Sequence, residues 1–257
     1  MSDSLLDAGH VSLDVADGIG TITFGHPRGN SRPGVLLRTL AATIAEAGQR
    51  EDVRVILLES TGTGPFCAGA SFDELQAIRT PEEGHVFFSG FAGVILAMKA
   101  CPRFIVTRVQ GKAAGGAVGL IAASDYAIGH TGASVRLSEL AIGIGPFVVG
   151  PPIEHKIGRA HCTALSVDHD WRDAAWALNV GLYARLANTP DELDTAVRTL
   201  AGRLAKAHPA AMAGLKQVFW EGTDHWPELL AARARMSGTL VLSEFTRSAI
   251  AAFGKRA

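Results

Sequence analysis

One stretch decides the fold: Arg108-Val109-Gln110-Gly111-Lys112-Ala113-Ala114-Gly115-Gly116-Ala117-Val118-Gly119-Leu120. The apolar run Phe104 to Val109 is typical of a buried strand, and a glycine-rich bend leads from it into an apolar segment typical of a helix. A helix that begins at Gly115 or Gly116 has backbone N–H groups without intrahelical acceptors, at the positive end of its dipole. Because glycine lets a ligand approach the backbone closely, we expect these N–H groups to form an oxyanion hole.

A second glycine-rich bend, Gly62 to Ser71, repeats this arrangement about 50 residues earlier in the chain. It follows a strand pattern at Val53 to Glu59, and it precedes a short helix that Ser71 can cap. Two such bends can direct two backbone amides at one carbonyl oxygen. The repeated unit therefore indicates a site that stabilises negative charge on a bound carbonyl.

Composition limits the partners of the chain. Its 257 residues are 47% hydrophobic, which is enough for one large domain or two modest ones. The net charge of −1 provides no general attraction for nucleic acid or for an anionic membrane, so we expect neither as a partner. The three cysteines, Cys67, Cys101 and Cys162, have no paired or metal-type spacing, so we expect a reducing compartment and no metal site. Residues 1–7 lack a basic, apolar leader, and the protein is predicted to be cytoplasmic.

Strand and helix patterns alternate along the first part of the chain, which predicts an α/β protein. The expected strands cover residues 10–15, 20–24, 53–59, 104–109, 125–128 and 133–137, and the expected helices cover 35–47, 71–78, 80–99 and 115–123. A loop is expected over 143–152, and nearly everything after His155 is expected to be helical, over about 160–166, 171–180, 190–208, 209–220 and 227–253, with a break near Ser237-Gly238. We therefore expect an α/β core over residues 1–190 and a helical region over 191–257 that packs on the core or on another subunit.

Four motifs in this order resemble the enoyl-CoA hydratase/isomerase, or crotonase, family over nearly the whole chain. They are Phe66-Cys67-Ala68-Gly69-Ala70, the bend Gly111 to Gly116, Leu137-Ser138-Glu139-Leu140 followed by Gly143 and Pro146, and Phe253-Gly254-Lys255-Arg256. The resemblance implies a crotonase-like spiral of strand-strand-helix repeats with a helical C-terminal trimerisation region. It also implies a homotrimer or a dimer of trimers that acts on acyl-CoA thioesters, with no cofactor besides the coenzyme A of the substrate.

The resemblance assigns roles to individual residues. It implies that the thioester carbonyl lies between the N–H groups of Ala68 and Gly116, and that Glu139 moves a proton at the α-carbon. The apolar neighbours of Glu139 should raise the pKa of its carboxyl. The substrate-binding residues expected from the resemblance are Phe66, Cys67, Gly69, Ala70, Gly115, Gly119 and Phe147, with Arg28 or Lys255 near the CoA phosphates.

The sequence departs from the family pattern at Gly119, where hydratases of the family have a second glutamate that activates water. One carboxylate suits a shuttle that removes a proton and returns it elsewhere, so the departure favours double-bond isomerisation over hydration. Two routes to hydration remain: another acid or a held water replaces the second glutamate, or Glu139 manages alone. The candidate replacement acids and bases are Asp73, Glu74 and His85.

Further departures are Ser71, Gln110 and the bulky run Pro146-Phe147-Val148-Val149-Gly150, which should reshape the acyl pocket. These departures leave open a second hypothesis, a catalytically silent protein that binds acyl-CoA or acts as a scaffold. Other chemistries fit poorly, because the chain has neither a P-loop nor the G-x-S-x-G pattern of serine hydrolases.

Overall fold

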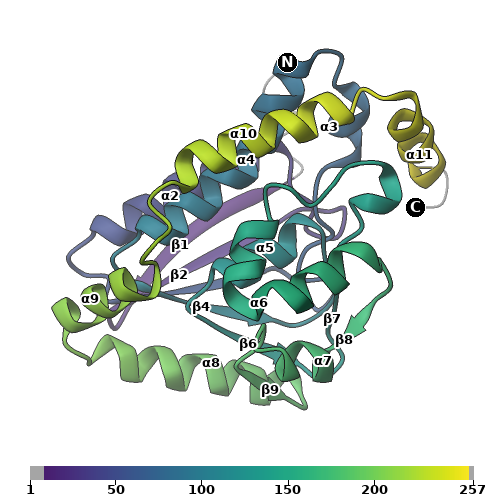
Figure 1. Cartoon of the computed structure of the whole chain (residues 1–257). Helices are drawn as coiled ribbons and strands as arrows, with labels where there is room; N and C mark the ends of the chain where they lie inside the picture. The colour runs from purple at the N-terminus through teal and green to yellow at the C-terminus, as the bar shows by residue number, and fades with distance from the viewer. Residues whose placement is uncertain (1–8, 255–257) are drawn as a thin grey trace.

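The computed structural model describes residues 9–254 of the chain, and its core is a six-stranded sheet with helices on both faces (Figure 1). The strand order is β1-β2-β3-β4-β6-β9, with β1 antiparallel to β2 and every later neighbour parallel. The six strands are β1 (His10–Ala16), β2 (Ile19–Gly25), β3 (Val55–Ser60), β4 (Phe104–Val109), β6 (Tyr126–His130) and β9 (Arg185–Ala187). A smaller sheet has the order β5-β7-β8 and consists of β5 (Ala113–Ala114), β7 (Ser134–Arg136) and β8 (Arg172–Asp173).

The helices begin and end largely where their sequence signals predict. Ser71 Oγ accepts the N–H of Glu74 at the start of α3, and Thr80 forms a capping box with Glu83 at the start of α4. In the described part of the chain the helices are α2 (Gly34–Gln49), α3 (Phe72–Ala77), α4 (Pro81–Ala100), α5 (Gly116–Ala123), the 3₁₀ helix η1 (Leu140–Ile142), α6 (Gly150–Val167), α7 (Ala174–Asn179), α8 (Pro190–Ala205), α9 (Pro209–Phe219), α10 (Trp226–Leu240) and α11 (Glu244–Gly254).

The central strands are buried on both faces, as a parallel sheet requires. In β3, Val55 and Leu57 face the core that α8 covers, whereas Ile56 and Leu58 belong to the larger core on the opposite face. The apolar runs that predicted β3 and β4 are thereby explained, because both sides of each strand contact helices. The helix α8 begins near the expected boundary at residue 190, and the division of the chain there stays a prediction.

The helix expected over about 160–166 is present, but the loop expected through residue 152 and the all-helical region expected after His155 are wrong in part. The helix expected from about residue 160 is part of α6, which begins at Gly150 and carries Pro151 and Pro152 in its first turn, where proline costs no intrahelical hydrogen bond. Gly158, at φ 77°, interrupts α6 and separates its first part, which begins at Gly150, from the second part, which contains the expected helix at 160–166. The region after His155 also contains strands β8 and β9, which are too short to carry a periodicity.

The break expected near Ser237-Gly238 occurs a few residues later, because α10 runs through these two residues to Leu240 and α11 begins at Glu244. Here α10 lies along α4 (Figure 1) with backbone against backbone. A Cβ atom on Gly84 of α4 would lie 2.6 Å from the Cα of Gly238, so both positions exclude a side chain. Gly238 therefore marks a close helix crossing, and the chain turns only between Leu240 and Glu244.

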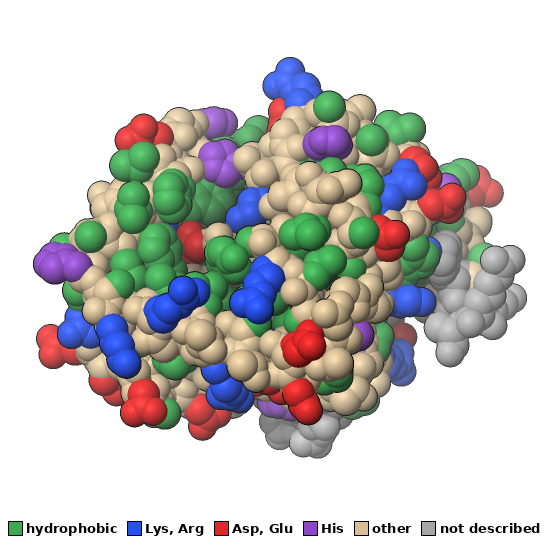
Figure 2. All heavy atoms as spheres, turned by 90° about the horizontal axis from the view of Figure 1, so that it is seen from below, with side chains coloured by type: hydrophobic (Ala, Val, Ile, Leu, Met, Phe, Trp, Pro, Cys, Tyr) green, Lys and Arg blue, Asp and Glu red, His purple; other side chains and the backbone are tan. Residues whose placement is uncertain are grey.

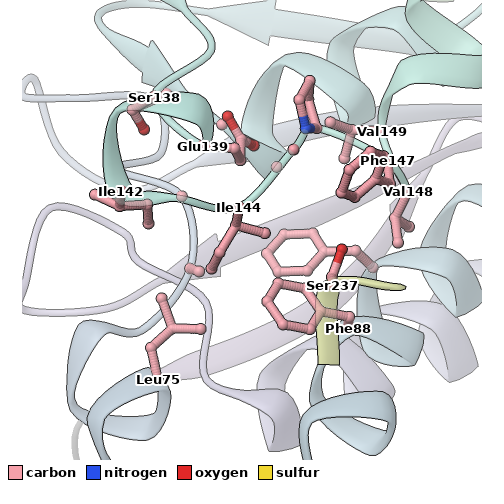
Figure 3. Close-up of a pocket in the computed structure, with 18 of the residues that line it drawn as sticks. Leu75, Phe88, Ser138, Glu139, Ile142, Ile144, Phe147, Val148, Val149 and Ser237 are labelled. Carbon is pink, nitrogen blue, oxygen red and sulfur yellow. The ribbon is translucent and has the colours of Figure 1, made fainter. Parts of the chain in front are cut away.

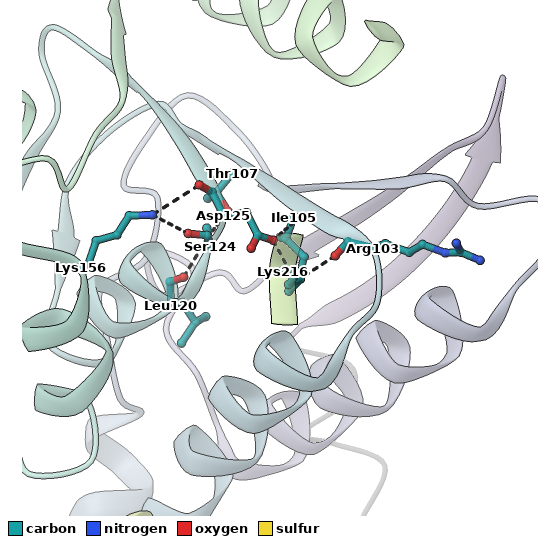
Figure 4. A network of polar contacts seen from close by, with 8 residues as sticks. All are labelled: Arg103, Ile105, Thr107, Leu120, Ser124, Asp125, Lys156 and Lys216. Atoms are coloured by element: carbon teal, nitrogen blue, oxygen red, sulfur yellow. Dashed lines mark hydrogen bonds and ion pairs between the residues drawn. The ribbon is translucent and has the colours of Figure 1, made fainter. Parts of the chain in front are cut away.

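A network of buried hydrogen bonds links α9 and α6 to the sheet (Figure 4). Asp125 Oδ2 accepts the backbone N–H of Ile105 at 2.7 Å and Lys216 Nζ of α9 at 2.8 Å. Lys156 of α6 donates to the carbonyl of Ser124 at 2.8 Å. The network gives the Asp125 carboxylate and each of the two ammonium groups hydrogen-bond partners where α5 ends, which indicates a structural role for Asp125.

Candidate active site

The two glycine-rich bends meet at one place, as the sequence predicts. Cys67 pairs with Ala113 as in a parallel sheet, with Cys67 N donating to Lys112 O at 3.2 Å and Ala114 N donating to Cys67 O at 3.0 Å. Gly69 has φ 95°, and a Cβ atom there would lie 2.8 Å from Ala114 O. Only glycine meets both requirements, so this residue lets the bends touch.

The second bend ends in the predicted helix start. Gly115 lies at φ 56° and donates its N–H to Arg136 O at 2.9 Å, and α5 begins at the next residue, Gly116. The Gly116 N–H has no hydrogen-bond acceptor among residues 9–254 and borders a pocket. It is therefore available to a ligand oxygen, and it lies at the positive end of the α5 dipole.

The structure contradicts one expectation about the second amide of the oxyanion hole. The N–H of Ala68, expected in the oxyanion hole, donates to the carbonyl of Gly29 at 2.9 Å and is not available to a ligand. Arg32 instead bonds to Gly69 O and Ser71 N, which leaves the backbone groups of the intervening Ala70 directed to the other side. The Ala70 N–H has no acceptor within the described part of the chain, and Ala70 lines the same pocket as Gly116.

Glu139 holds its carboxyl against the second bend. A Cβ atom on Gly115 would lie 2.9 Å from Glu139 Oε1, so the absence of a side chain at residue 115 makes room for the carboxyl. Glu139 Oε2 is buried without a hydrogen-bond partner among the described residues. Burial raises the pKa of Glu139 to about 7, against smaller lowering effects of backbone hydrogen bonds and of the Arg136 charge. The carboxyl can therefore both accept and release a proton near neutral pH.

The walls of this pocket are apolar (Figure 3). Among the described residues that line it, Glu139 is the one titratable side chain, and Ser138 and Ser237 carry the other polar side-chain groups. The large apolar lining residues are Phe72, Leu75, Phe88, Phe91, Ile142, Ile144, Phe147, Val148 and Val149. The cavity measures about 60 Å³, more than the ~10–15 Å³ that one water needs and less than the ~150 Å³ of a cavity that binds benzene.

Val149 closes the space beside Gly119. A Cβ atom at Gly119 would lie 2.7 Å from both Cβ and Cγ1 of Val149, which leaves no room for a longer side chain. The candidate replacement acids and bases are elsewhere: Asp73 pairs with Arg28, Glu74 accepts the N–H of Gly34, and His85 contacts Ser89. None of these groups lines the pocket, so among residues 9–254 Glu139 is the one acid that borders it.

The predicted site residues fall into two groups. Those that line the pocket are Glu139, Ala68, Gly69, Ala70, Gly115, Gly116 and Phe147. Four others lie outside its lining: Phe66 and Cys67 are fully buried behind the bend, Gly119 lies beneath Val149, and Arg28 is exposed and paired with Asp73. Lys255 and the end of the C-terminal motif lie outside the described residues.

Ser237 is a lining residue that sequence reasoning missed. It comes from α10, far along the chain, and is 1% exposed. Leu230, Ala234 and Val241 share its buried helix face. A polar residue on that apolar stripe was the available signal.

The surface and the rest of the described chain show few other features of a binding site. Figure 2 shows acidic and basic side chains interspersed on the face it presents. No group of three or more His, Cys, Asp or Glu side chains is arranged to hold a metal ion within residues 9–254. No helix in that range has the length and apolar character needed to cross a membrane.

Comparison with known proteins identifies relatives over the full length. The family model described as "Enoyl-CoA hydratase/isomerase" matches residues 14–256. The "Probable enoyl-CoA hydratase" of Bacillus subtilis is 24% identical, with 95% of each chain covered. The peroxisomal "Delta(3,5)-Delta(2,4)-dienoyl-CoA isomerase" of Arabidopsis thaliana is 26% identical, over 68% of this chain and 67% of that one. The crystal structure of an enoyl-CoA hydratase from Bacillus halodurans superimposes with a TM-score of 0.87 at 18% identity, over 94% of this chain and 99% of that one.

Proposed function

Because the chain belongs to the enoyl-CoA hydratase/isomerase family and has the crotonase fold, we propose that Glu139 moves a proton at the α-carbon of an acyl-CoA thioester. One observation carries the proposal: a buried carboxyl with a pKa near 7 lies against the glycine that precedes a free helix N-terminus. Deprotonated, it takes the α-proton; protonated, it returns a proton to the carbon chain.

The negative charge left on the thioester oxygen needs donors. In this proposal they are the N–H groups of Ala70 and Gly116, which border the cavity and have no acceptor among the described residues. Loss of one donor of this kind typically costs about a hundredfold to a thousandfold in rate. We still expect Arg28 or Lys255 to bind the phosphates of coenzyme A.

Within the family, a double-bond shift suits this pocket better than water addition. A shift needs one group that takes a proton from one carbon and returns it to another, and Glu139 can do both. Activation of water by two carboxylates would need a second acid, and Val149 fills the space beside Gly119 where such an acid would stand. The small apolar cavity supports a short acyl group.

Glu139→Gln tests the proposal, because glutamine keeps the shape and loses the proton transfer. The wild-type protein, incubated with 2-enoyl- and 3-enoyl-CoA esters in deuterated water, should shift the double bond and exchange α-protons. The variant should lose both by about a hundredfold or more, while calorimetry shows that it still binds the ester. The exposed Glu51→Gln serves as the control and should behave as wild type.

Three outcomes would change this conclusion. Equal activity of Glu139→Gln and wild type would remove Glu139 from the reaction. Water addition by wild type would overturn the preference for a double-bond shift. Tight binding of esters with no turnover by wild type would instead support the silent binding or scaffolding protein.

A further inference from the structure

The hydroxyl of Ser237 lines the pocket and has no hydrogen-bond partner among residues 9–254. Other hydroxyls on helices bond to the carbonyl four residues earlier: Ser166 donates to Cys162 O at 2.7 Å, and Thr239 donates to Arg235 O at 3.1 Å. Ser237 makes no such bond, and its hydroxyl is directed away from its own helix. Figure 3 shows the oxygen between Phe88 and Phe147.

The apolar surroundings make it energetically unfavourable to leave the Ser237 hydroxyl without a hydrogen bond. The walls beside it are apolar, and Ser237 is 1% exposed, so bulk water does not hydrate it freely. A buried hydroxyl without a partner costs about 1–3 kcal/mol, judged from substitutions in proteins. Glu139 and Ser138 come from the loop after β7, whereas Ser237 comes from α10, on the other side of the apolar walls.

The helix that carries Ser237 is packed tightly against α4 beside the pocket. Gly238 contacts Gly84 of α4 backbone to backbone, and Phe88, one turn beyond Gly84, is a pocket wall. Packed helices of this kind hold their side chains in fixed positions. The hydroxyl is therefore presented in one place to whatever fills the cavity.

We propose that Ser237 is a specificity determinant that hydrogen-bonds an oxygen on the acyl group, several bonds away from the thioester. The substrate class is then a short acyl-CoA with a carbonyl or hydroxyl group on its chain, rather than a plain hydrocarbon chain. This inference rests on the proposed function, because it assumes that the thioester lies at Glu139. A binding site whose hydroxyl hydrogen-bonds a polar group of the substrate rejects an analogue without that group, because the hydroxyl is then left unpaired.

The experiment compares matched pairs of thioesters: pentanoyl-CoA with 4-oxopentanoyl-CoA, and hexanoyl-CoA with 5-oxohexanoyl-CoA. For each, kcat/KM of α-proton exchange in deuterated water and the Kd from calorimetry are measured. The wild-type protein should prefer one of the oxo esters about tenfold, the value of roughly one hydrogen bond. In Ser237→Ala the preference should disappear, chiefly because the hydrocarbon ester improves.

Ser166→Ala is the matched control, since it removes a helix hydroxyl outside the pocket, and it should keep the wild-type preference. The inference is overturned if neither oxo ester is preferred by wild type, or if Ser237→Ala keeps the preference. Exchange of the hydrocarbon ester by Ser237→Ala shows that the variant folds. If no ester exchanges in any variant, the proposed function fails, and the ratio of Kd values still decides the role of Ser237.

Discussion

The raised pKa of the Glu139 carboxyl predicts how the proposed activity depends on pH. In the proposed function the carboxylate takes the α-proton, so we expect kcat/KM for exchange to fall about tenfold per pH unit below pH 7 and to level off above it. The profile is measured by α-proton exchange across buffers from pH 5 to 9. A flat profile would show that another group takes the proton.

The same shift predicts a stability effect. The folded-state pKa of Glu139 is about 7 and the ordinary value is 4.5, so between these values the folded protein binds more protons than the unfolded chain. The free energy of unfolding should therefore decrease as the pH rises from 4.5 to 7. Urea titrations of wild type and Glu139→Gln would measure this, and the variant should lack that contribution to the decrease.

Gly115 provides a second residue-scale prediction. Gly115→Ala places a Cβ atom 2.9 Å from Glu139 Oε1 at a residue with φ 56°, so the carboxyl must move and the backbone is strained. We expect at least a tenfold loss of kcat/KM and a loss of about 1–2 kcal/mol of stability. Gly214→Ala, on α9 with no atom near the added Cβ, is the control and should be neutral or slightly stabilising. Equal kinetics of the two variants would contradict the close contact.

At this scale the sequence predicted which residues lie side by side better than it predicted their hydrogen bonds. The helix start at Gly116 and the placement of Glu139 beside it followed from glycine spacing and from the family resemblance. The expectation that the Ala68 N–H faces a ligand is contradicted, because that N–H donates to the carbonyl of Gly29. That contact joins residues from separate loops, and no local pattern encodes it.

At the scale of elements, the crossing of α4 and α10 should tolerate no side chain. Gly84→Ala places a methyl group 2.6 Å from the Cα of Gly238, and overpacking of this kind costs about 1–3 kcal/mol. Gly93→Ala lies on the same helix with no neighbour near its Cβ, so it should be neutral or gain up to about 1 kcal/mol. Thermal unfolding of both variants tests the prediction, and similar melting temperatures would contradict it.

Most elements with their own sequence pattern were predictable, including the short α3 and β7, whereas three of the shortest strands were not. Strand β4 has the predicted bounds, Phe104–Val109, because both of its faces are apolar. Strands β5, β8 and β9 have two or three residues each, and their pairing depends on distant strands rather than on their own sequence. Gly238 looked like a helix breaker, although packing against Gly84 requires it there.

For the whole molecule, α9 presents an unusual surface. Leu215, Val218 and Phe219 share one face of the helix and are 49%, 56% and 53% exposed. Contiguous apolar surface of this kind often marks an interface. We expect the protein to self-associate through this face, in line with the predicted homotrimer or dimer of trimers.

Light scattering after size-exclusion chromatography tests this expectation. Val218→Glu should shift the protein toward smaller species, because a charge would be buried in the interface. Val86→Glu, 60% exposed on α4, is the control and should leave the mass unchanged. A monomeric wild type would refute the expectation. The cytoplasmic location, the lack of a separate cofactor and the boundary at residue 190 also stay predictions.

The contact between Gly119 and Val149 constrains the order in which this protein can change its chemistry. Because residue 149 occupies the volume that a side chain at 119 would need, a substitution at 119 alone is expected to be deleterious. A smaller residue at 149 would act as a permissive mutation, after which position 119 becomes free to vary. The two positions are thus expected to show sign epistasis, and directed evolution toward a new acid at 119 should pass through 149 first.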